Sequence, residues 1–139
     1  MCKNNTCYTY FKIVGDFNPN TITKILNLTP SRHWSIGDLR KNGSSYDFAL
    51  WEYGRCSEYD VLVENQMMKT INDLIPKVKD LKEIRQKYDV EYTIQIVPSV
   101  YVGEPTPCLS PNRKIIEFCY VTETELDIDL YVYGSEYSK

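Results

Sequence analysis

The sequence predicts one α+β domain over residues 1–139, with a mostly antiparallel sheet of about five strands and three to four helices packed mainly on one face. Two observations predict this class. Segments in which apolar and polar residues alternate, the period of a strand, occur along the chain between segments with the period of a helix. A chain of 139 residues is also long enough to bury about two thirds of its unfolded surface in one core.

The first strand and the first helix have the clearest patterns. Alternation in residues 7–14 predicts a strand with two different faces. Its expected inward face consists of Cys7, Thr9, Phe11 and Ile13, and its outward face consists of Tyr8, Tyr10, Lys12 and Val14. Asn18 and Pro19 then predict the N-cap and the first residue of a helix, because the cap accepts a first-turn N–H and proline loses no hydrogen bond there.

The same stretch raises the alternative of a calcium site. Oxygen-bearing side chains occur at every second position from Asp16 to Asn20, as they do at the start of an EF-hand loop. That loop also requires glycine at its sixth position and a bidentate glutamate at its twelfth, and these positions are Thr21 and Asn27 here. We therefore interpret the stretch as a helix cap and expect no metal there.

A long loop and a central strand are expected next. Residues 29–45 are predicted as a loop, with a short strand around residues 34–36 and a tight turn at Asn42–Gly43. Residues 46–53 are largely apolar on both faces, which favours a strand in the middle of the sheet.

Two helices are expected after this strand. Asp60 is the predicted N-cap of a helix that ends near Ile75, because Pro76 cannot donate to the preceding turn. Apolar residues at helical spacing then predict a second helix from Val78 to Tyr88.

The C-terminal third contains another strand, a helix and a last strand. Residues 90–97 alternate as a strand, and Ser110–Pro111 predict the start of a helix by the same cap-and-proline pattern. Residues 125–133 alternate as the last strand. Its expected inward face consists of Leu126, Ile128, Leu130 and Val132, and its outward face consists of Glu125, Asp127, Asp129, Tyr131 and Tyr133.

Composition disfavours several classes of protein. The chain is 42% hydrophobic and 25% charged, as an ordinary globular protein is, and no apolar run approaches the roughly 18 residues that span a membrane. Residues 1–5 lack the apolar core of a secretory signal, so we expect a cytoplasmic location. The net charge of −3 disfavours nucleic acid as a partner.

Five cysteines without a C-x-x-C spacing are expected to be reduced thiols, with no disulfide and no zinc site.

The chain shows no recognisable catalytic constellation, and no cofactor is expected. His33 is the only histidine, and no nucleophile elbow of the form G-x-S-x-G accompanies it. Packing of His33 in a loop against Trp34 is the favoured interpretation. The alternative is a small hydrolase or ligand-binding enzyme that uses His33 with a carboxylate, such as Asp127, or with a thiol.

The tyrosines suggest a protein-binding surface. If the first and last strands are neighbours, their outward faces form an aromatic and acidic patch of Tyr8, Tyr10, Asp127, Asp129, Tyr131 and Tyr133. Tyrosine is a common anchor of protein interfaces, so we expect a protein partner or a homodimer. Two alternatives remain: the tyrosines simply cover an exposed sheet, or the two aspartates act in acid–base chemistry or hold a metal. For the aspartates we favour a solvated face.

Several of these segments, taken in order, resemble a known family. The segments are FKIVGDFNPNTITKILNLTPSR (residues 11–32), Gly37–Asp38, Trp51, Ile75–Pro76, KYDVEYTIQIV, and LSP followed by ELDIDLY. Their order is similar to that of the bacterial family named domain of unknown function 4279, from about Phe11 to Tyr131. The resemblance implies a small stand-alone intracellular bacterial protein with an α+β fold, and it transfers no catalytic residues. The chain departs from the family pattern at Asn27, where glycine is more common.

By analogy alone, the binding could be that of an immunity protein. Some small acidic α+β proteins neutralise a toxin delivered by a neighbouring cell, and they do so by binding it.

Overall fold

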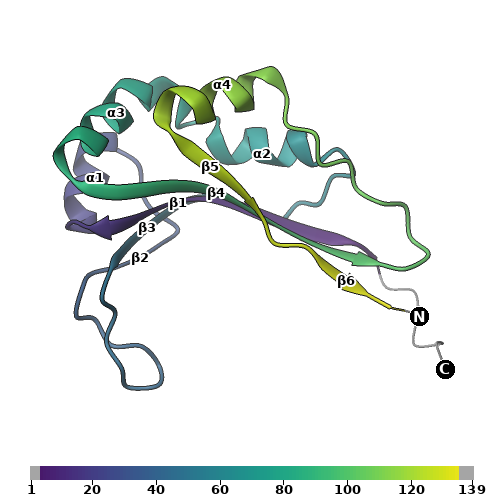
Figure 1. The fold of residues 1–139 in the computed structure, drawn as a ribbon, viewed down its shortest axis with the longest axis horizontal. Helices are drawn as coiled ribbons and strands as arrows, with labels where there is room; N and C mark the ends of the chain where they lie inside the picture. The colour runs from purple at the N-terminus through teal and green to yellow at the C-terminus, as the bar shows by residue number, and fades with distance from the viewer. Residues whose placement is uncertain (1–3, 135–139) are drawn as a thin grey trace.

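The computed structural model describes residues 4–134, which form one curved sheet with helices on one of its faces (Figure 1). The strands are β1 (Thr6–Asp16), β2 (Arg32–Trp34), β3 (Ala49–Cys56), β4 (Asp89–Tyr101), β5 (Thr124–Ile128) and β6 (Tyr131–Tyr133). The helices are α1 (Pro19–Leu26), α2 (Val63–Ile71), α3 (Val78–Lys87) and α4 (Arg113–Thr122), with a 3₁₀ turn, η1, at Ile75–Lys77. The predicted α+β class is confirmed.

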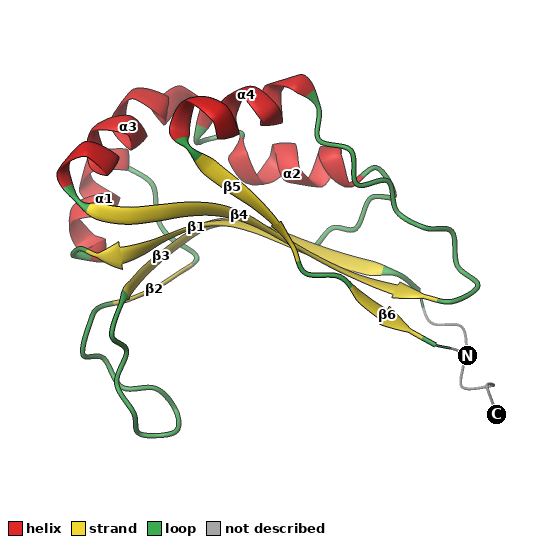
Figure 2. Cartoon of the chain, viewed as in Figure 1, coloured by secondary structure: helices red, strands yellow, loops and turns green. Residues whose placement is uncertain are grey.

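The sheet is mostly antiparallel, as predicted, with the order β2-β3-β1-β4-β5. β1 lies at the centre and is antiparallel to both β3 and β4. β5 and β6 run parallel to β4, because α4 first carries the chain back along the helical face. The four helices lie on one face and leave the other face uncovered (Figure 2). Within residues 4–134, no helix is both long and apolar enough to cross a membrane.

The core lies between the sheet and the helices. Its almost fully buried members include Phe11, Ile13, Trp51, Tyr92 and Ile94 from the strands and Ile22, Met67, Leu81, Ile84 and Phe118 from the helices. The ring of Phe11 packs against those of Tyr92 and Phe118, at centroid distances of 5.6 and 6.1 Å. The predicted inward face of the first strand is confirmed, since Cys7, Thr9, Phe11 and Ile13 are all buried.

The first helix begins and ends as its local sequence predicts. The Asn20 N–H donates to Asn18 Oδ1 at 2.9 Å, and Pro19 is the first residue of α1. The helix ends at Asn27, which has a left-handed backbone with φ of 54°. Asparagine tolerates this conformation better than other residues except glycine. Asn27 therefore makes this turn without glycine.

We expect the Asn18 cap to contribute stability and calcium to contribute none. Replacing Asn18 by alanine should lower the free energy of unfolding by about 1 kcal/mol, because an N–H of the first turn loses its acceptor.

Millimolar calcium should leave the thermal midpoint of the wild-type protein unchanged, since a specifically bound ion would stabilise the folded state. A rise of several degrees with calcium would contradict the cap interpretation.

The start of α2 differs from the prediction. α2 begins at Val63, because the two preceding residues are held in an extended bridge, in which the Cys108 N–H donates to Val61 O at 2.7 Å. The Asp60 carboxylate accepts the Leu62 N–H at 2.8 Å, so it stabilises the turn before the helix and does not cap it.

Two further helix boundaries also differ. α2 ends at Ile71, before the region of Ile75, and the chain passes through a turn into η1. α4 is capped by Asn112 and not by Ser110–Pro111: Asn112 Oδ1 accepts the Ile115 N–H at 3.0 Å. Both asparagine and serine are good caps, so the local pattern did not distinguish them.

The boundaries of β2 and β3 differ from the predicted ones, and aromatic packing accounts for the difference at β3. β2 spans residues 32–34 and not 34–36, and β3 begins at Ala49 and not at residue 46. The rings of Tyr46 and Phe48 instead pack against Trp34, with a Trp34–Tyr46 centroid distance of 3.8 Å.

β4 continues beyond its predicted end at residue 97, through Pro98. Pro98 is tolerated because it lies beside the break between β5, which ends opposite Ile96, and β6, which starts opposite Ser99.

The predicted last strand, residues 125–133, is divided into β5 and β6, and its expected inward face is wrong in part. Leu126 is half-buried against the core, whereas Ile128, Leu130 and Val132 are 43%, 49% and 63% exposed. No helix reaches over this end of the sheet (Figure 1). Alternation therefore predicted the side of the strand on which these residues lie but not whether they are buried.

Candidate functional site

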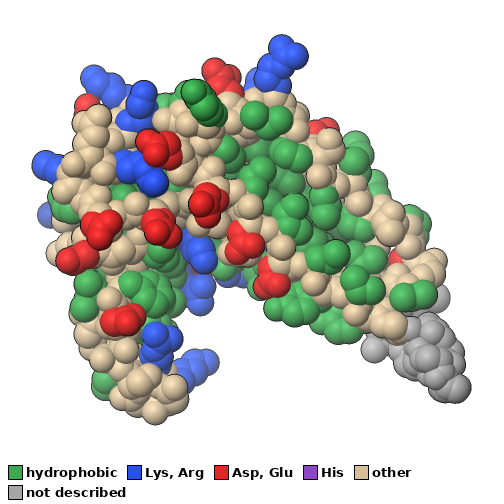
Figure 3. All heavy atoms as spheres, viewed as in Figure 1, with side chains coloured by type: hydrophobic (Ala, Val, Ile, Leu, Met, Phe, Trp, Pro, Cys, Tyr) green, Lys and Arg blue, Asp and Glu red, His purple; other side chains and the backbone are tan. Residues whose placement is uncertain are grey.

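The helix-free face of the sheet is hollowed. The loop of residues 35–48 projects beyond the sheet at one end and β6 descends at the other, and the space-filling view shows an arch between them (Figures 1 and 3). We call the roof of this arch the open face. It carries the outward side chains Tyr8, Tyr10, Lys12, Arg32, Trp34, Glu52, Thr93, Gln95, Val97, Tyr101, Asp127, Tyr131 and Tyr133, as the strand register shows.

The predicted tyrosines all lie on the open face, but the strands that carry them are not neighbours. β4 separates β1 from β6. Tyr8 and Tyr10 stack on β1 with a centroid distance of 6.1 Å, and Tyr133 stacks with Tyr101 of β4 at 4.9 Å. Tyr8, Tyr131 and Tyr133 are 37%, 47% and 44% exposed, and Tyr10 is half-buried. The sequence reasoning missed Tyr101, because only the register places it beside this group.

The predicted aspartates lie along the edge of the same face. Asp127 pairs in register with Gln95, and Asp129 accepts a hydrogen bond from the Tyr131 hydroxyl at 3.1 Å. This hydrogen bond to a carboxylate raises the pKa of Tyr131. With Glu125, these exposed acids occupy alternate positions along β5 and just after it. Figure 3 shows acidic side chains in red along the near edge of the arch. Among residues 4–134, no cluster of three or more acidic, histidine or cysteine side chains is arranged to hold a metal.

A buried carboxylate and two arginines occupy the other side of the open face. The side chain of Glu52 is fully buried. Arg55 donates to it through Nε at 2.9 Å and through Nη2 at 3.1 Å. Arg32 donates from the neighbouring strand at 3.1 Å, and Ser31 Oγ donates at 2.8 Å. One negative charge therefore holds two positive charges in place, and the cluster has a net charge of +1.

The arginines of this cluster also pack on aromatic rings. The Arg55 guanidinium lies 4.8 Å from the ring centroid of Tyr8 and 4.6 Å from that of Tyr10, and Arg32 lies 5.3 Å from that of Trp34. Such contacts favour a fixed guanidinium orientation. The open face is thus basic and aromatic over β2, β3 and β1 and acidic over β5. The sequence predicted the tyrosines and the acidic part but not the arginines.

Glu52 is ionised in this environment. Burial raises the pKa of its carboxyl group, but hydrogen bonds from Arg55 and Ser31 and the charges of both arginines outweigh burial and bring the pKa below its ordinary value. The sequence did contain a signal for this cluster: Glu52 is a charged residue between apolar residues of a strand that was predicted to be central. Its partners could not be assigned without the register.

His33 lies on β2, not in a loop, and is exposed. It pairs in register with Trp51, and because successive strand residues point to opposite faces, it points away from Trp34. Within the described part of the chain, the His33 side chain forms no hydrogen bond or ion pair. The hydrolase alternative therefore rests on the sequence alone.

The described cysteines are free thiols, as predicted. Burial raises the pKa of both Cys7 and Cys119 to about 11, so both remain protonated near neutral pH. Cys2 lies outside the described residues.

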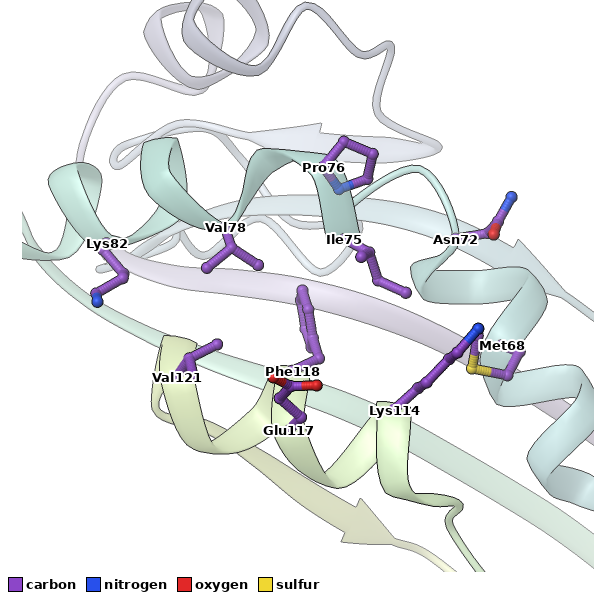
Figure 4. A pocket seen from close by; sticks show the side chains of 10 residues that line it. All are labelled: Met68, Asn72, Ile75, Pro76, Val78, Lys82, Lys114, Glu117, Phe118 and Val121. Carbon is purple, nitrogen blue, oxygen red and sulfur yellow. The ribbon is translucent and has the colours of Figure 1, made fainter.

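A groove of about 630 Å³ lies on the helical face, on the side of the sheet opposite the open face (Figure 4). Its apolar walls come from α2, η1, α3 and α4, and Lys82 and Lys114 are among its polar lining residues. The groove is large enough for a small ligand. None of the predicted site residues lines it.

The chain belongs to a known family: the model of the family described as Domain of unknown function (DUF4279) matches residues 5–133. No curated protein and no solved structure matches the chain. Because the family is described as one of unknown function, membership supplies no activity.

Proposed function

We propose that this member of the DUF4279 family is a non-catalytic protein-binding domain of the bacterial cytoplasm, which binds a partner protein through its open face. One observation supports this proposal: tyrosines and ordered charged groups are exposed together on a hollow face that no helix covers. An immunity-type inhibitor, which blocks a toxin by binding it, would use such a face.

The chemistry of the open face suits protein binding. Tyrosine provides a large contact area with few rotatable bonds, and its hydroxyl group tolerates both water and a buried interface. Arg55 is held by Glu52 and by two tyrosine rings, so little side-chain entropy would be lost when it contacts a partner. The separate basic and acidic regions would orient the partner and speed its arrival.

The shape of the open face favours a different protein over a second copy of this chain. Two hollow faces placed against each other would leave a gap between them, whereas a convex partner would fill the arch (Figure 3). Good packing at the centre of an interface is a property of stable complexes.

Alanine substitutions on the open face are expected to weaken partner binding. Tyr10→Ala and Tyr131→Ala should each cost about 1–3 kcal/mol of binding free energy if these residues are anchors, with little loss of stability. The tagged protein would be used to isolate partners from the source cell, and the affinity of each candidate would then be measured with purified proteins.

Tyr120→Ala is the matched control, because Tyr120 is 83% exposed on α4, on the helical face. The proposal predicts a partner that both open-face variants bind weakly and that the control variant binds normally. If every isolated protein binds the open-face variants as tightly as wild type, the proposed function is wrong.

A further inference from the structure

The edge of the sheet formed by β5 and β6 has unpaired backbone groups. Within residues 4–134, no strand pairs with this edge on the side away from β4. The Asp129 N–H donates to Ile96 O at 2.8 Å, and Tyr133 O accepts the Val102 N–H at 3.0 Å, so the odd-numbered residues face β4. By alternation, the N–H and C=O groups of Leu126, Ile128 and Val132 point to the free edge.

Large apolar and aromatic side chains are exposed along part of this edge. Ile128, Leu130 and Val132 are exposed on the helical side, and Tyr131 and Tyr133 are exposed on the open face. A hollow of about 330 Å³ lies beside β6, and Leu130 and Val132 contribute to its walls. Figure 3 shows a broad hydrophobic surface over this end of the molecule. The exposed edge is therefore apolar on the helical side and aromatic on the open face at β6, and an exposed apolar edge favours pairing with another strand.

The charges of the edge indicate the chemistry of that strand. Glu125 and Asp127 lie on the open face at alternate positions of β5, and Asp129 follows them. A second copy paired antiparallel along β5 would bring the acids of both copies onto one face, and like charges on adjacent strands are destabilising. A strand with basic residues on this face and apolar residues on the other would match both sets of side chains.

We infer that an extended segment of the partner adds to the β5–β6 edge as a further strand, and that lysine or arginine alternates with apolar residues in this segment. The inference rests on the proposed function, since it specifies how the partner contacts the acidic end of the open face. Main-chain hydrogen bonds would hold the segment, and its alternate side chains would provide specificity.

A pair of short peptides tests the inference on the full chain. The first peptide alternates lysine and valine, and the second alternates glutamate and valine; both have blocked ends and a fluorescent label. Fluorescence anisotropy should show that wild-type protein binds the lysine peptide at least about tenfold more tightly, because cross-strand charge pairs replace repulsions. Equal affinity for the two peptides would overturn the inference.

Proline at an outward-facing position tests strand addition itself. Ile128→Pro should weaken binding of the lysine peptide about tenfold, because it removes an edge N–H and leaves the hydrogen bonds to β4 in place. Ile128→Thr, which keeps the N–H and the net charge, should bind within about threefold of wild type. If Ile128→Pro does not fold, Val132→Pro replaces it in the same experiment. Unchanged binding of the lysine peptide by a folded proline variant would overturn the inference.

This test can fail independently of the proposed function. If the lysine peptide does not bind but Tyr10→Ala still weakens the partner, only the strand-addition inference is wrong. If the peptide binds but no partner depends on Tyr10 or Tyr131, the proposed function is wrong. If the wild-type chain dimerises and Ile128→Pro abolishes the dimer, a second copy of the chain occupies the edge. This outcome would also overturn the inference.

Discussion

Replacing Gly54 by alanine is expected to lower the free energy of unfolding by about 2–5 kcal/mol, because backbone strain and a steric clash act together. Gly54 has a φ of +75°, which residues with a Cβ rarely adopt. An added Cβ would also overlap the Thr70 carbonyl oxygen of α2. The approach is fixed by the Thr70 hydroxyl, which lies 2.8 Å from Gly54 O and 2.7 Å from Thr9 Oγ1. These hydrogen bonds hold α2 against β3 at Gly54, the residue that directly precedes Arg55 in the sequence.

Gly43→Ala is the matched control for this prediction. Gly43 has a similar φ of +90°, but no atom lies within 4 Å of an added Cβ. Its replacement should therefore cost only the backbone strain, about 1–2 kcal/mol. Urea unfolding of the two variants measures the difference. Equal losses of stability would show that the contact between β3 and α2 is not as close as described.

Replacing Glu52 by alanine is the second substitution with a large expected effect, a loss of about 2–4 kcal/mol in unfolding free energy. The change removes charged hydrogen bonds to Arg32, Arg55 and Ser31, and it leaves two adjacent cations without their shared anion. The arginine side chains are 50% and 41% exposed, so water compensates part of the loss. Glu58→Ala, which breaks the exposed pair with Lys69, should leave the free energy of unfolding nearly unchanged, because water screens that pair.

The Glu52 cluster should also make stability depend on pH in the acidic range. The pKa of Glu52 is lower in the folded protein than its ordinary value, so the folded state favours the ionised form. This contribution is fully present above the unfolded pKa of about 4.3 and is lost as the pH falls through the folded pKa. Between about pH 5 and pH 3, wild-type stability should fall more steeply than that of Glu52→Gln. Identical slopes would contradict this assignment.

The elements that sequence predicted well are those that local chemistry decides. The alternation of β1 gives the correct faces because its inward residues are strongly apolar, and Asn18–Pro19 fixes the start of α1. Asp60 and Ser110 are equally good caps by type, but the bridge to Cys108 and the competing Asn112 decide where α2 and α4 start. These are tertiary or competing contacts, which a local pattern does not contain.

The candidate site was predicted only in part, because it depends on strand register. The outward direction of the predicted tyrosines followed from alternation, whereas the position of β4 between β1 and β6 did not. The pairing of Glu52 with Arg32 joins residues of two strands, and Tyr101 meets Tyr133 in the same way. The exposure of Ile128 reflects where the helices end, which the pattern of β5 does not encode.

Oxidative footprinting of tyrosines in the purified partner complex tests the central claim most directly. Hydroxyl radicals modify accessible side chains, and mass spectrometry compares the free protein with the complex. The proposed function predicts that Tyr8, Tyr131 and Tyr133 lose reactivity in the complex, while Tyr120 on α4 stays as reactive as in the free protein. Protection of Tyr120 with unchanged reactivity of the three open-face tyrosines would place the partner on the helical face and contradict the proposal.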